Sequence, residues 1–531
     1  MDPGIKEALD RGLNIFLTGA GGVGKSFQSE RIIEYLKQNI SVCAPTGAAA
    51  IQVGGVTIHS LLGQGLFVGT VDSLVERMMK IRGGDLVKQW CTMDTLLIDE
   101  LSMTDVSLFV RASKVIQAIR RHVYEYPWKY NGLKVSGIKS EKDLDKPWGG
   151  IRLILVGDFL QLPPIQPYVE QIGIVIEKGG DGNDIELPVT KSYRYLFEHP
   201  IWTEIDPYVI YLNEPKRFMT GDIDEEEANE YFHILGDIRL GILSERVKQF
   251  MSECSKKPQA KKFPCIEEYN ASITSLTAGV HGMSIGTENK KEAIIFPTVL
   301  IATNKEVDKH NMDQLKKLQG EEHTYHATFR CNSRTTVMSK EDMTRSCLAP
   351  DPLTLKIGAQ VMLLTNKLDL GLCNGSRGVV VGFKEVRGTR IEQRIGDNNN
   401  PNNSPIINSS ECLPIVQFMN GRIIAIEPYT WSCTLRTKGL STDEKPRASL
   451  TQIPLRLAYA LSIHKAQGIS LDSVYLSLSS CFAPGQLYVA LSRCRSRANT
   501  FIKDWDEKSF WKCRPDKKAI EFYANLKPST L

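Results

Sequence analysis

A glycine-rich loop between an apolar run and a helical segment constrains the fold of this chain more than any other feature. The run Ile15–Leu17 has the pattern of a short buried strand, residues 19–26 fit G-x-x-x-x-G-K-[ST], and residues 27–38 have helical periodicity. Glycines let backbone N–H groups surround phosphate oxygens, and the helix N-terminus adds partial positive charge. Lys25 can then reach the β and γ phosphates of a nucleotide, and the Ser26 hydroxyl can bind Mg²⁺. The sequence therefore predicts an α/β fold with a phosphate-binding loop.

Two further apolar runs end in polar residues suited to triphosphate hydrolysis. The segment TLLIDELSM has the pattern of a strand that ends in Asp99 and Glu100. We expect Asp99 to hold Mg²⁺ and Glu100 to polarise the attacking water. A third strand, Ile151–Val156, leads to Gln161, which is placed to contact the γ-phosphate or the attacking water. A loop-capping amide is the alternative for Gln161, and Asp158 is expected to cap the turn.

Composition excludes several classes of protein and leaves nucleic-acid binding open. The 531 residues suggest three or four compact units, since a domain has about 100–200 residues. Lys and Arg number 65 against 61 acids, a net charge of +4 that excludes a polycationic tail. No apolar run approaches the roughly 18 residues of a membrane span, and the N-terminus lacks a signal peptide. Twelve scattered cysteines indicate a reduced, intracellular and soluble protein.

The order of the motifs resembles that of the PIF (petite integration frequency) helicases, superfamily 1B DNA helicases related to the RecD type. The resemblance extends from about residue 12 to about residue 505. Its motifs are GAGGVGKS, APTGAAAIQVGGVTIHSLLG, LLIDELSM, KPWGGIRLILVGDFLQLPPI, LKIGAQVMLLTNK, NGSRGVVVGF, LAYALSIHKAQGISLD and GQLYVALSRCRS. It implies two RecA-like domains with parallel sheets, ATP bound between them, and 5′→3′ translocation on single-stranded DNA.

The resemblance assigns roles to residues in both domains. It implies that hydrolysis depends on Glu100, Lys25, Gln161, Arg493 and Arg217, and that Ser26 and Asp99 hold Mg²⁺. An arginine supplied across a cleft, as Arg493 would be, stabilises charge on the γ-phosphate. Arg217 stands where the family usually has Arg-Gln, so the pattern departs at Phe218. The implied nucleotide contacts are Gly19, Gly21, Gly22, Val23, Gly24, Lys25, Ser26, Gln467 and Gly468.

The resemblance also implies DNA contacts on both domains. Hydroxyls, amides and backbone N–H groups on phosphates bind DNA without reading its sequence. The implied contacts are Thr46, Thr57, His59, Asn304, His464, Lys465 and Gln467, and Arg495 and Arg497 extend them as a basic segment. A lone histidine is as readily a structural hydrogen bonder. At the position of the family's adenine-reading glutamine this chain has Asp2, and no glutamine precedes Gln28.

The motif positions predict a domain order. Residues 1–205 are expected to form domain 1A, with a small domain 1B at about 64–92. Residues 206–370 and 450–531 are expected to form domain 2A. Short β-branched runs at 371–449 predict an inserted small β-barrel, domain 2B, which contains a polar loop at 396–410. Residues 255–292 are lysine-rich and weakly patterned.

Residues 120–146 contain four interleaved aromatic residues among lysines and arginines. Tyr124, Tyr126, Trp128 and Tyr130 occupy alternate positions, which favours a half-buried strand facing a core. The alternative is a surface on which the aromatic rings stack on nucleotides and the lysines and arginines neutralise phosphates.

The resemblance and the motifs together predict an ATP- and Mg²⁺-dependent 5′→3′ DNA helicase that unwinds duplex, forks or other structured DNA in replication, repair or recombination. The expected partners are single-stranded DNA and single-strand/duplex junctions, with no membrane, and the expected active form is a monomer. One alternative is a translocase that displaces proteins with little unwinding. A second is a nucleic-acid-binding module with a vestigial ATP site, against which the complete set of hydrolytic residues argues.

Overall fold

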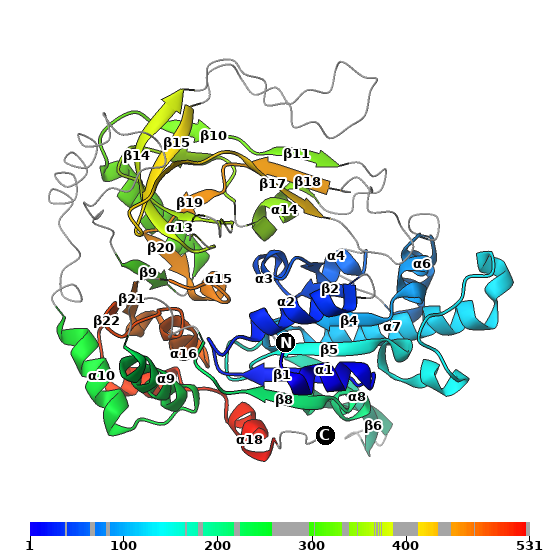
Figure 1. Ribbon diagram of the computed structural model, residues 1–531. Helices are drawn as coiled ribbons and strands as arrows, with labels where there is room; N and C mark the ends of the chain where they lie inside the picture. Colours follow the sequence, from blue (N-terminus) through cyan, green and yellow to red (C-terminus); the bar gives the residue numbers. More distant parts are fainter. Residues whose placement is uncertain are drawn as a thin grey trace, which may run out of the picture.

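Two parallel α/β sheets, with antiparallel β-structure inserted into the second, make up the protein (Figure 1). The computed structural model describes residues 1–37, 40–63, 70–80, 85–164, 167–178, 184–216, 224–257, 297–301, 303–331, 339–347, 349–365, 367, 370, 372, 374–385, 412–433, 448–471 and 473–526. This arrangement confirms the expected fold class. In these ranges no helix is long and apolar enough to cross a membrane.

The first sheet has the strand order β3-β2-β4-β5-β1-β8, and every pairing in it is parallel. Strands β1, β2 and β4 are buried along their whole length, as expected for a parallel sheet with helices on both faces. The strands are β1 (Ile15–Gly19), β2 (Ile40–Ala44), β3 (Val56–Thr57), β4 (Thr95–Ile98), β5 (Arg152–Gly157) and β8 (Tyr208–Leu212). Strands β4, β5 and β1 are neighbours, so the loops after them meet at one edge.

The helices around the first sheet vary widely in length. The α-helices are α1 (Pro3–Asp10), α2 (Lys25–Leu36), α3 (Gly47–Gln52), α4 (Ile58–Leu61), α5 (Val71–Lys80), α6 (Asp85–Thr92), α7 (Val106–Glu125) and α8 (Pro200–Ile205). The 3₁₀ turns are η3 (Leu101–Met103), η4 (Pro127–Tyr130), η5 (Glu141–Asp145), η6 (Pro147–Gly150) and η7 (Leu196–Glu198). The segment expected to form domain 1B consists, where the structure describes it, of α5 and α6, which both pack against α7.

The first unit extends further along the chain than the sequence predicted. Strand β8 pairs with β1 from Tyr208 to Leu212, so the expected boundary at residue 205 is wrong: ladder hydrogen bonds place these residues in the first sheet. A long antiparallel hairpin, β6 (Tyr168–Lys178) with β7 (Asp184–Tyr193), precedes β8 and was not predicted.

The second sheet is smaller, with four parallel strands in the order β20-β9-β21-β22. The strands are β9 (Thr298–Ile301), β20 (Ala460–Ser462), β21 (Val474–Ser477) and β22 (Thr500–Lys503). The helices and turns of this unit are α9 (Glu225–Arg239), α10 (Glu245–Lys256), α13 (Asn304–Lys317), α15 (Ile463–Ala466), η9 (Leu478–Ser480), α16 (Gln486–Leu491), α17 (Glu507–Lys512) and α18 (Lys517–Asn525).

An insertion of antiparallel β-structure lies between β9 and β20 in the sequence. Its largest sheet has the order β16-β15-β14-β13-β19, and smaller sheets pair β10 with β12 and place β18 between β11 and β17. The elements are β10 (His323–Tyr325), β11 (Thr328–Cys331), α14 (Lys340–Cys347), β12 (Leu353–Leu355), β13 (Gln360–Leu363), β14 (Arg377–Glu385), β15 (Cys412–Phe418), β16 (Ile423–Ala425), β17 (Tyr429–Cys433), β18 (Ala448–Gln452) and β19 (Leu455–Leu457). Because β13 and β19 pair with each other, the insertion reaches beyond the expected 371–449 on both sides. Residues 396–410 and 258–292 lie outside the described ranges.

The aromatic residues of 120–146 do not form a half-buried strand, so that prediction is wrong. Tyr124 lies in the last turn of α7, Tyr126 directly precedes the turn η4, and Trp128 lies within it. The exposed fraction is 36% for Tyr126 and 70% for Trp128. Only Tyr130 packs against the core. The alternating aromatic residues therefore come from the end of a helix and the turn that follows it, where most of these rings are exposed to solvent.

A buried arginine on α7 holds segments that lie before and after this helix in the chain. Arg120 is fully buried, and its guanidinium donates hydrogen bonds to the carbonyl oxygens of Trp90 (2.6 Å), Gly149 (2.9 Å) and Ser136 (2.5 Å). Burial lowers the pKa of Arg120 to about 10, against the opposing effect of Cys91 and Asp94. The rigid fork of an arginine suits such a divergent set of acceptors.

We expect Arg120→Ala to lower the free energy of unfolding of the first unit by about 3 kcal/mol or more, because the buried carbonyl groups lose their donors. The matched control is Arg121→Ala on the same helix, where the exposed pairs with Glu141 and Asp145 should contribute less than about 1 kcal/mol. Urea unfolding followed by tryptophan fluorescence measures both changes, since Trp90 and Trp148 lie in this core. Equal losses in the two variants would contradict this role of Arg120.

Candidate nucleotide and DNA site

The phosphate-binding loop has the backbone that its glycines predict. Strand β1 ends at Gly19, and helix α2 begins at Lys25 directly after Gly24, which has φ +92°. Gly22 is also left-handed, and a Cβ on Gly19 would overlap the carbonyl oxygen of Leu212. The loop therefore requires residues without a side chain, and its N–H groups lead into the N-terminus of α2, where anions bind.

Lys25 lies over this loop. Its Nζ donates to the carbonyl oxygens of Gly19 (2.7 Å) and Ala20 (2.9 Å). Burial lowers the pKa of Lys25, and the carboxylates of Asp158, Glu100 and Asp99 oppose that shift. Those acids keep a positive charge favourable at the place where phosphates would bind.

Asp99 and Glu100 follow β4 at the same edge of the sheet. Asp99 is almost fully buried, and its Oδ1 accepts a hydrogen bond from the Glu100 backbone N–H at 2.8 Å. Burial and the neighbouring Glu100 raise the pKa of Asp99 to about 7. Glu100 itself has φ +50°, a conformation that non-glycine residues rarely adopt and that occurs at functional sites.

Helix α16 of the second unit brings Arg493 against the phosphate-binding loop. The Tyr488 hydroxyl accepts a hydrogen bond from Gly21 N–H at 2.6 Å, and a Cβ on Gly21 would lie 3.3 Å from Arg493 Nη2. Arg493 is 2% exposed and donates to Val489 O (2.9 Å) and Ser492 Oγ (2.8 Å). Burial lowers the pKa of Arg493, and Glu100 opposes this. An arginine of one unit thus lies at the phosphate loop of the other.

Gln467, just after α15, reaches the acidic pair from the second unit. Its Nε2 donates to Glu100 Oε2 at 2.8 Å, while Gln52 Nε2 donates to the carbonyl oxygen of Gly468 at 3.0 Å. The candidate nucleotide-contacting residues of the second unit therefore lie directly at the candidate catalytic carboxylate.

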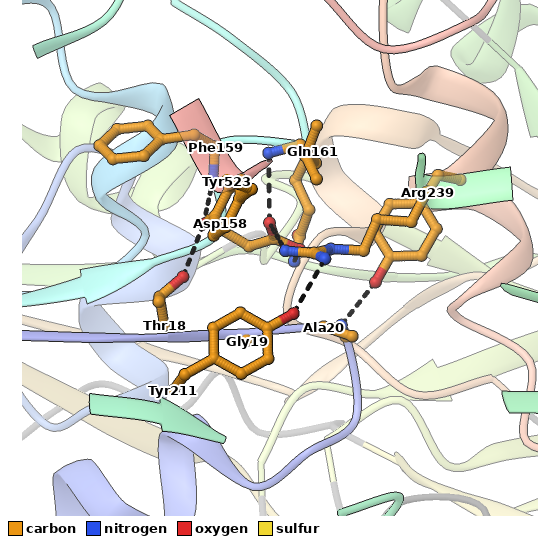
Figure 2. A network of polar contacts seen from close by, with 12 residues as sticks. Thr18, Gly19, Ala20, Asp158, Phe159, Gln161, Tyr211, Arg239 and Tyr523 are labelled. Atoms are coloured by element: carbon orange, nitrogen blue, oxygen red, sulfur yellow. Dashed lines mark hydrogen bonds and ion pairs between the residues drawn. The ribbon is translucent and has the colours of Figure 1, made fainter. Parts of the chain in front are cut away.

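The loop after β5 contains a buried ion pair that no sequence pattern indicated (Figure 2). Asp158 accepts from Leu160 N–H at 3.1 Å, which confirms the expected turn cap, and it also binds Arg239 of α9 through Nη2 (2.8 Å) and Nε (3.0 Å). Gln161 Nε2 donates to Asp158 Oδ2 at 3.3 Å. Burial alone would raise the pKa of Asp158, but the Arg239 charge lowers it below the usual carboxyl range. The side chain of Gln161 is thereby tied to an interdomain ion pair.

The candidate DNA contacts of the first unit lie at helix starts beside the sheet edge. Thr57 caps α4 by accepting from Ser60 N–H at 3.2 Å, and the Thr46 hydroxyl accepts from Ala49 N–H at 3.3 Å at the start of α3. His59 lies on α4, and burial lowers its pKa, an effect that Asp105 opposes.

The candidate DNA contacts of the second unit lie at the corresponding edge of the smaller sheet. Asn304 begins α13, and its Oδ1 accepts from Ser462 Oγ at 2.9 Å. His464 and Lys465 lie on α15, and burial lowers the pKa of His464. Burial therefore favours the neutral imidazole of His464, which has one N–H donor.

One of the sequence-based assignments, Arg497, has ion-pair partners within its own unit. Arg497 pairs with Glu230 of α9 (2.5 Å) and Glu253 of α10 (2.6 Å), which are contacts within the second unit. These ion pairs raise the pKa of Arg497 despite its partial burial and indicate a structural role. Arg495, closer to α16, is half-buried. Arg217 lies outside the described residues.

Two family models match the chain: PIF1-like helicase over residues 5–249, and the 2B domain of the DNA helicase Pif1 over residues 340–383. The chain belongs to the PIF1-like helicase family. The second match begins upstream of residue 371, in agreement with the strands described above.

Relatives of this PIF1-like helicase include a viral protein of similar length. Uncharacterized protein 030L of Invertebrate iridescent virus 6 is 29% identical over 97% of this chain and 91% of its own length. ATP-dependent DNA helicase PIF1 of Homo sapiens is 30% identical over 98% of this chain, which spans 63% of the human protein. The crystal structure of Pif1 helicase from Candida albicans shares 27% identity and a TM-score of 0.60, covering 98% of this chain and 97% of that one.

Two residues of this site in the PIF1-like helicase, Tyr488 and Arg239, were not predicted from the sequence. Tyr488 lies in the motif GQLYVALSR, five residues before Arg493, so its neighbourhood was accessible. Arg239 had no such signal, because its partner Asp158 is 81 residues away and belongs to the other sheet.

We expect Asp158→Asn and Arg239→Met each to lower the free energy of unfolding by about 3–5 kcal/mol, because each leaves a buried charged or polar group without its partner. Replacing both residues with Leu and Met should recover much of that loss. The contribution of Asp158 is present at neutral pH and should be lost as pH falls through its lowered pKa.

The control for this pair is Arg246→Met, which breaks an exposed ion pair with Asp237 and should cost less than about 1 kcal/mol. Urea unfolding at pH 7 compares the variants. If Asp158→Asn were as mild as Arg246→Met, the buried pair would not hold the units together.

Proposed function

We propose that this chain is an ATP-dependent DNA helicase that moves 5′→3′ on single-stranded DNA. The observation that carries the proposal is the arrangement of Arg493 and Gln467: one lies against the phosphate-binding loop and the other is bonded to Glu100, and both come from the second sheet. A site completed by two sheets can couple the state of the nucleotide to the movement of one sheet relative to the other.

Mg²⁺ fits the oxygen groups present at this edge. Ser26 lies exposed in the first turn of α2. Asp99 is a buried carboxylate with a raised pKa, so a cation beside it would favour its ionised form. Hydroxyl and carboxylate oxygens, completed by phosphate, are the ligands that Mg²⁺ prefers. The bound ion would neutralise charge on the β and γ phosphates.

The hydrolytic step divides among four side chains of this protein. Lys25 binds the phosphates, Glu100 orients the attacking water, and Gln161 contacts the γ-phosphate or that water. Arg493 stabilises the charge that develops on the transferred group. Gln467 of the second unit holds Glu100, and Arg239 of the second unit holds the Asp158 carboxylate to which Gln161 is bonded. Both water-orienting groups therefore depend on contacts made by the second unit.

Each unit also has its own candidate DNA contacts. Thr46, Thr57 and His59 belong to the first, and Asn304, His464, Lys465 and Arg495 to the second. Hydroxyl, amide and imidazole groups bind phosphates without regard to base sequence. Two sets of contacts on separate sheets allow one set to hold the strand while the other advances, which a monomer can perform alone.

A pair of tailed duplexes tests the function directly. With ATP and Mg²⁺, we expect unwinding of a DNA duplex with a single-stranded 5′ tail and none of the same duplex with a 3′ tail. Strand separation is measured on native gels. Unwinding from the 3′ tail alone would refute the polarity, and displacement of streptavidin without strand separation would point to a protein-displacing translocase.

We expect Glu100→Gln to lower DNA-stimulated kcat by about 10²–10³-fold, because the amide cannot orient the attacking water as a carboxylate does. Nucleotide affinity should remain, since the phosphate-binding loop is unchanged. The control is Glu34→Gln on the exposed face of α2. Phosphate release measures turnover and a fluorescent nucleotide measures binding; wild-type turnover in Glu100→Gln would show the assignment to be wrong.

A further inference from the structure

The C-terminal helix α18 crosses back from the second unit to the first. It follows β22 in the chain, yet it packs against the first unit (Figure 1). Phe522 stacks on Phe197 with ring centroids 4.2 Å apart and contacts Phe159 and Phe16 at 5.5 and 6.3 Å. This aromatic packing fixes α18 beside the strands β1 and β5.

The next residue, Tyr523, joins the two loops that follow those strands. Its hydroxyl lies 2.6 Å from Thr18 Oγ1 and accepts from Phe159 N–H at 3.2 Å, as Figure 2 shows. Thr18 directly precedes the phosphate-binding loop, and Phe159 lies between Asp158 and Gln161. Burial raises the pKa of Tyr523, so the hydroxyl keeps its proton, and one donor with two acceptor sites serves both contacts.

The ladder between β1 and β5 ends where these contacts begin. The last registered pair is Thr18 with Gly157. Beyond it no backbone ladder fixes the distance between the two loops, although Lys25 and Gln161 must act on the same phosphate. The Tyr523 hydroxyl therefore joins the two loops just beyond the last paired residues of the strands.

The ring of Tyr523 also supports the ion pair behind Gln161. The Arg239 guanidinium lies 4.7 Å from the ring centroid and donates to the Tyr211 hydroxyl at 3.2 Å. Arg239 in turn holds Asp158, which accepts a hydrogen bond from Gln161 Nε2. Two paths, one through the hydroxyl and one through the ring, thus connect α18 to Gln161.

We propose that Tyr523 is a positioning residue for ATP hydrolysis: its hydroxyl sets the spacing between the phosphate-binding loop and the Gln161 loop. The inference rests on the proposed function and adds to it a role for the C-terminal helix. It requires that loss of the hydroxyl slow turnover while nucleotide binding remains, because the loop glycines and Lys25 keep their own contacts.

The test compares three variants of the full chain in DNA-stimulated ATP hydrolysis. Tyr523→Phe keeps the ring and removes the hydroxyl, and Thr18→Val removes the other side of the same contact. Each should lower kcat by about tenfold and change the KM for ATP by less than about twofold, since one lost hydrogen bond corresponds to roughly a factor of ten. Asn525→Ala is the control: it changes an exposed side chain of the same helix, which bonds the Glu521 carbonyl oxygen within α18, and it should keep kcat.

A double-variant comparison shows whether the effect passes through Gln161. In a Gln161→Ala background, Tyr523→Phe should change kcat no further. The inference is overturned if Tyr523→Phe has wild-type kcat, if it lowers kcat equally in the Gln161→Ala background, or if Asn525→Ala loses kcat to the same extent. A wild-type chain that hydrolyses no ATP would refute the proposed function itself, which is a separate result.

Discussion

The parallel pairing of β4, β5 and β1 is the constraint on which the rest of the site depends. Three neighbouring strands of one sheet end at the same edge, so Asp99, Asp158 and Gly19 begin three loops that lie side by side. Ladder hydrogen bonds fix the strands but not the loops beyond them. The candidate phosphate-contacting side chains therefore need further contacts to hold them in place.

Most of those further contacts come from the second unit. Tyr488 and Arg493 lie against the phosphate-binding loop, Gln467 is bonded to Glu100, and Arg239 holds Asp158. Exposed polar contacts would hold the two units together only weakly. Separating the buried Asp158–Arg239 pair is costly, because each charge would lose its partner. The same contacts that complete the site for hydrolysis thus link the positions of the two sheets, which is what a motor requires.

Prediction from the sequence succeeded where a local pattern carries its own physical meaning. The order of strand, glycine loop and helix at residues 15–38 was recovered, as were the strands that end at Asp99 and before Asp158. It failed where a pattern has two structural solutions. Tyr126 and Trp128 alternate with polar residues as in a strand, but they lie at a helix end and a turn because Pro127 begins η4.

The sequence by itself determined the chemistry available to this protein: glycines that can surround phosphate, acids at strand ends, and an ordered set of motifs that resembles the PIF helicases. The glycines and the acids are local features, because each set lies within one short segment, whereas the motif order is read along the whole chain. Only the tertiary structure decided which partners meet. It paired Arg239 with Asp158, bound Arg497 to Glu230 and Glu253, and placed Tyr523 between Thr18 and Phe159. Such pairings join residues up to 505 positions apart, and they follow from the packing of whole elements rather than from any pattern within one of them.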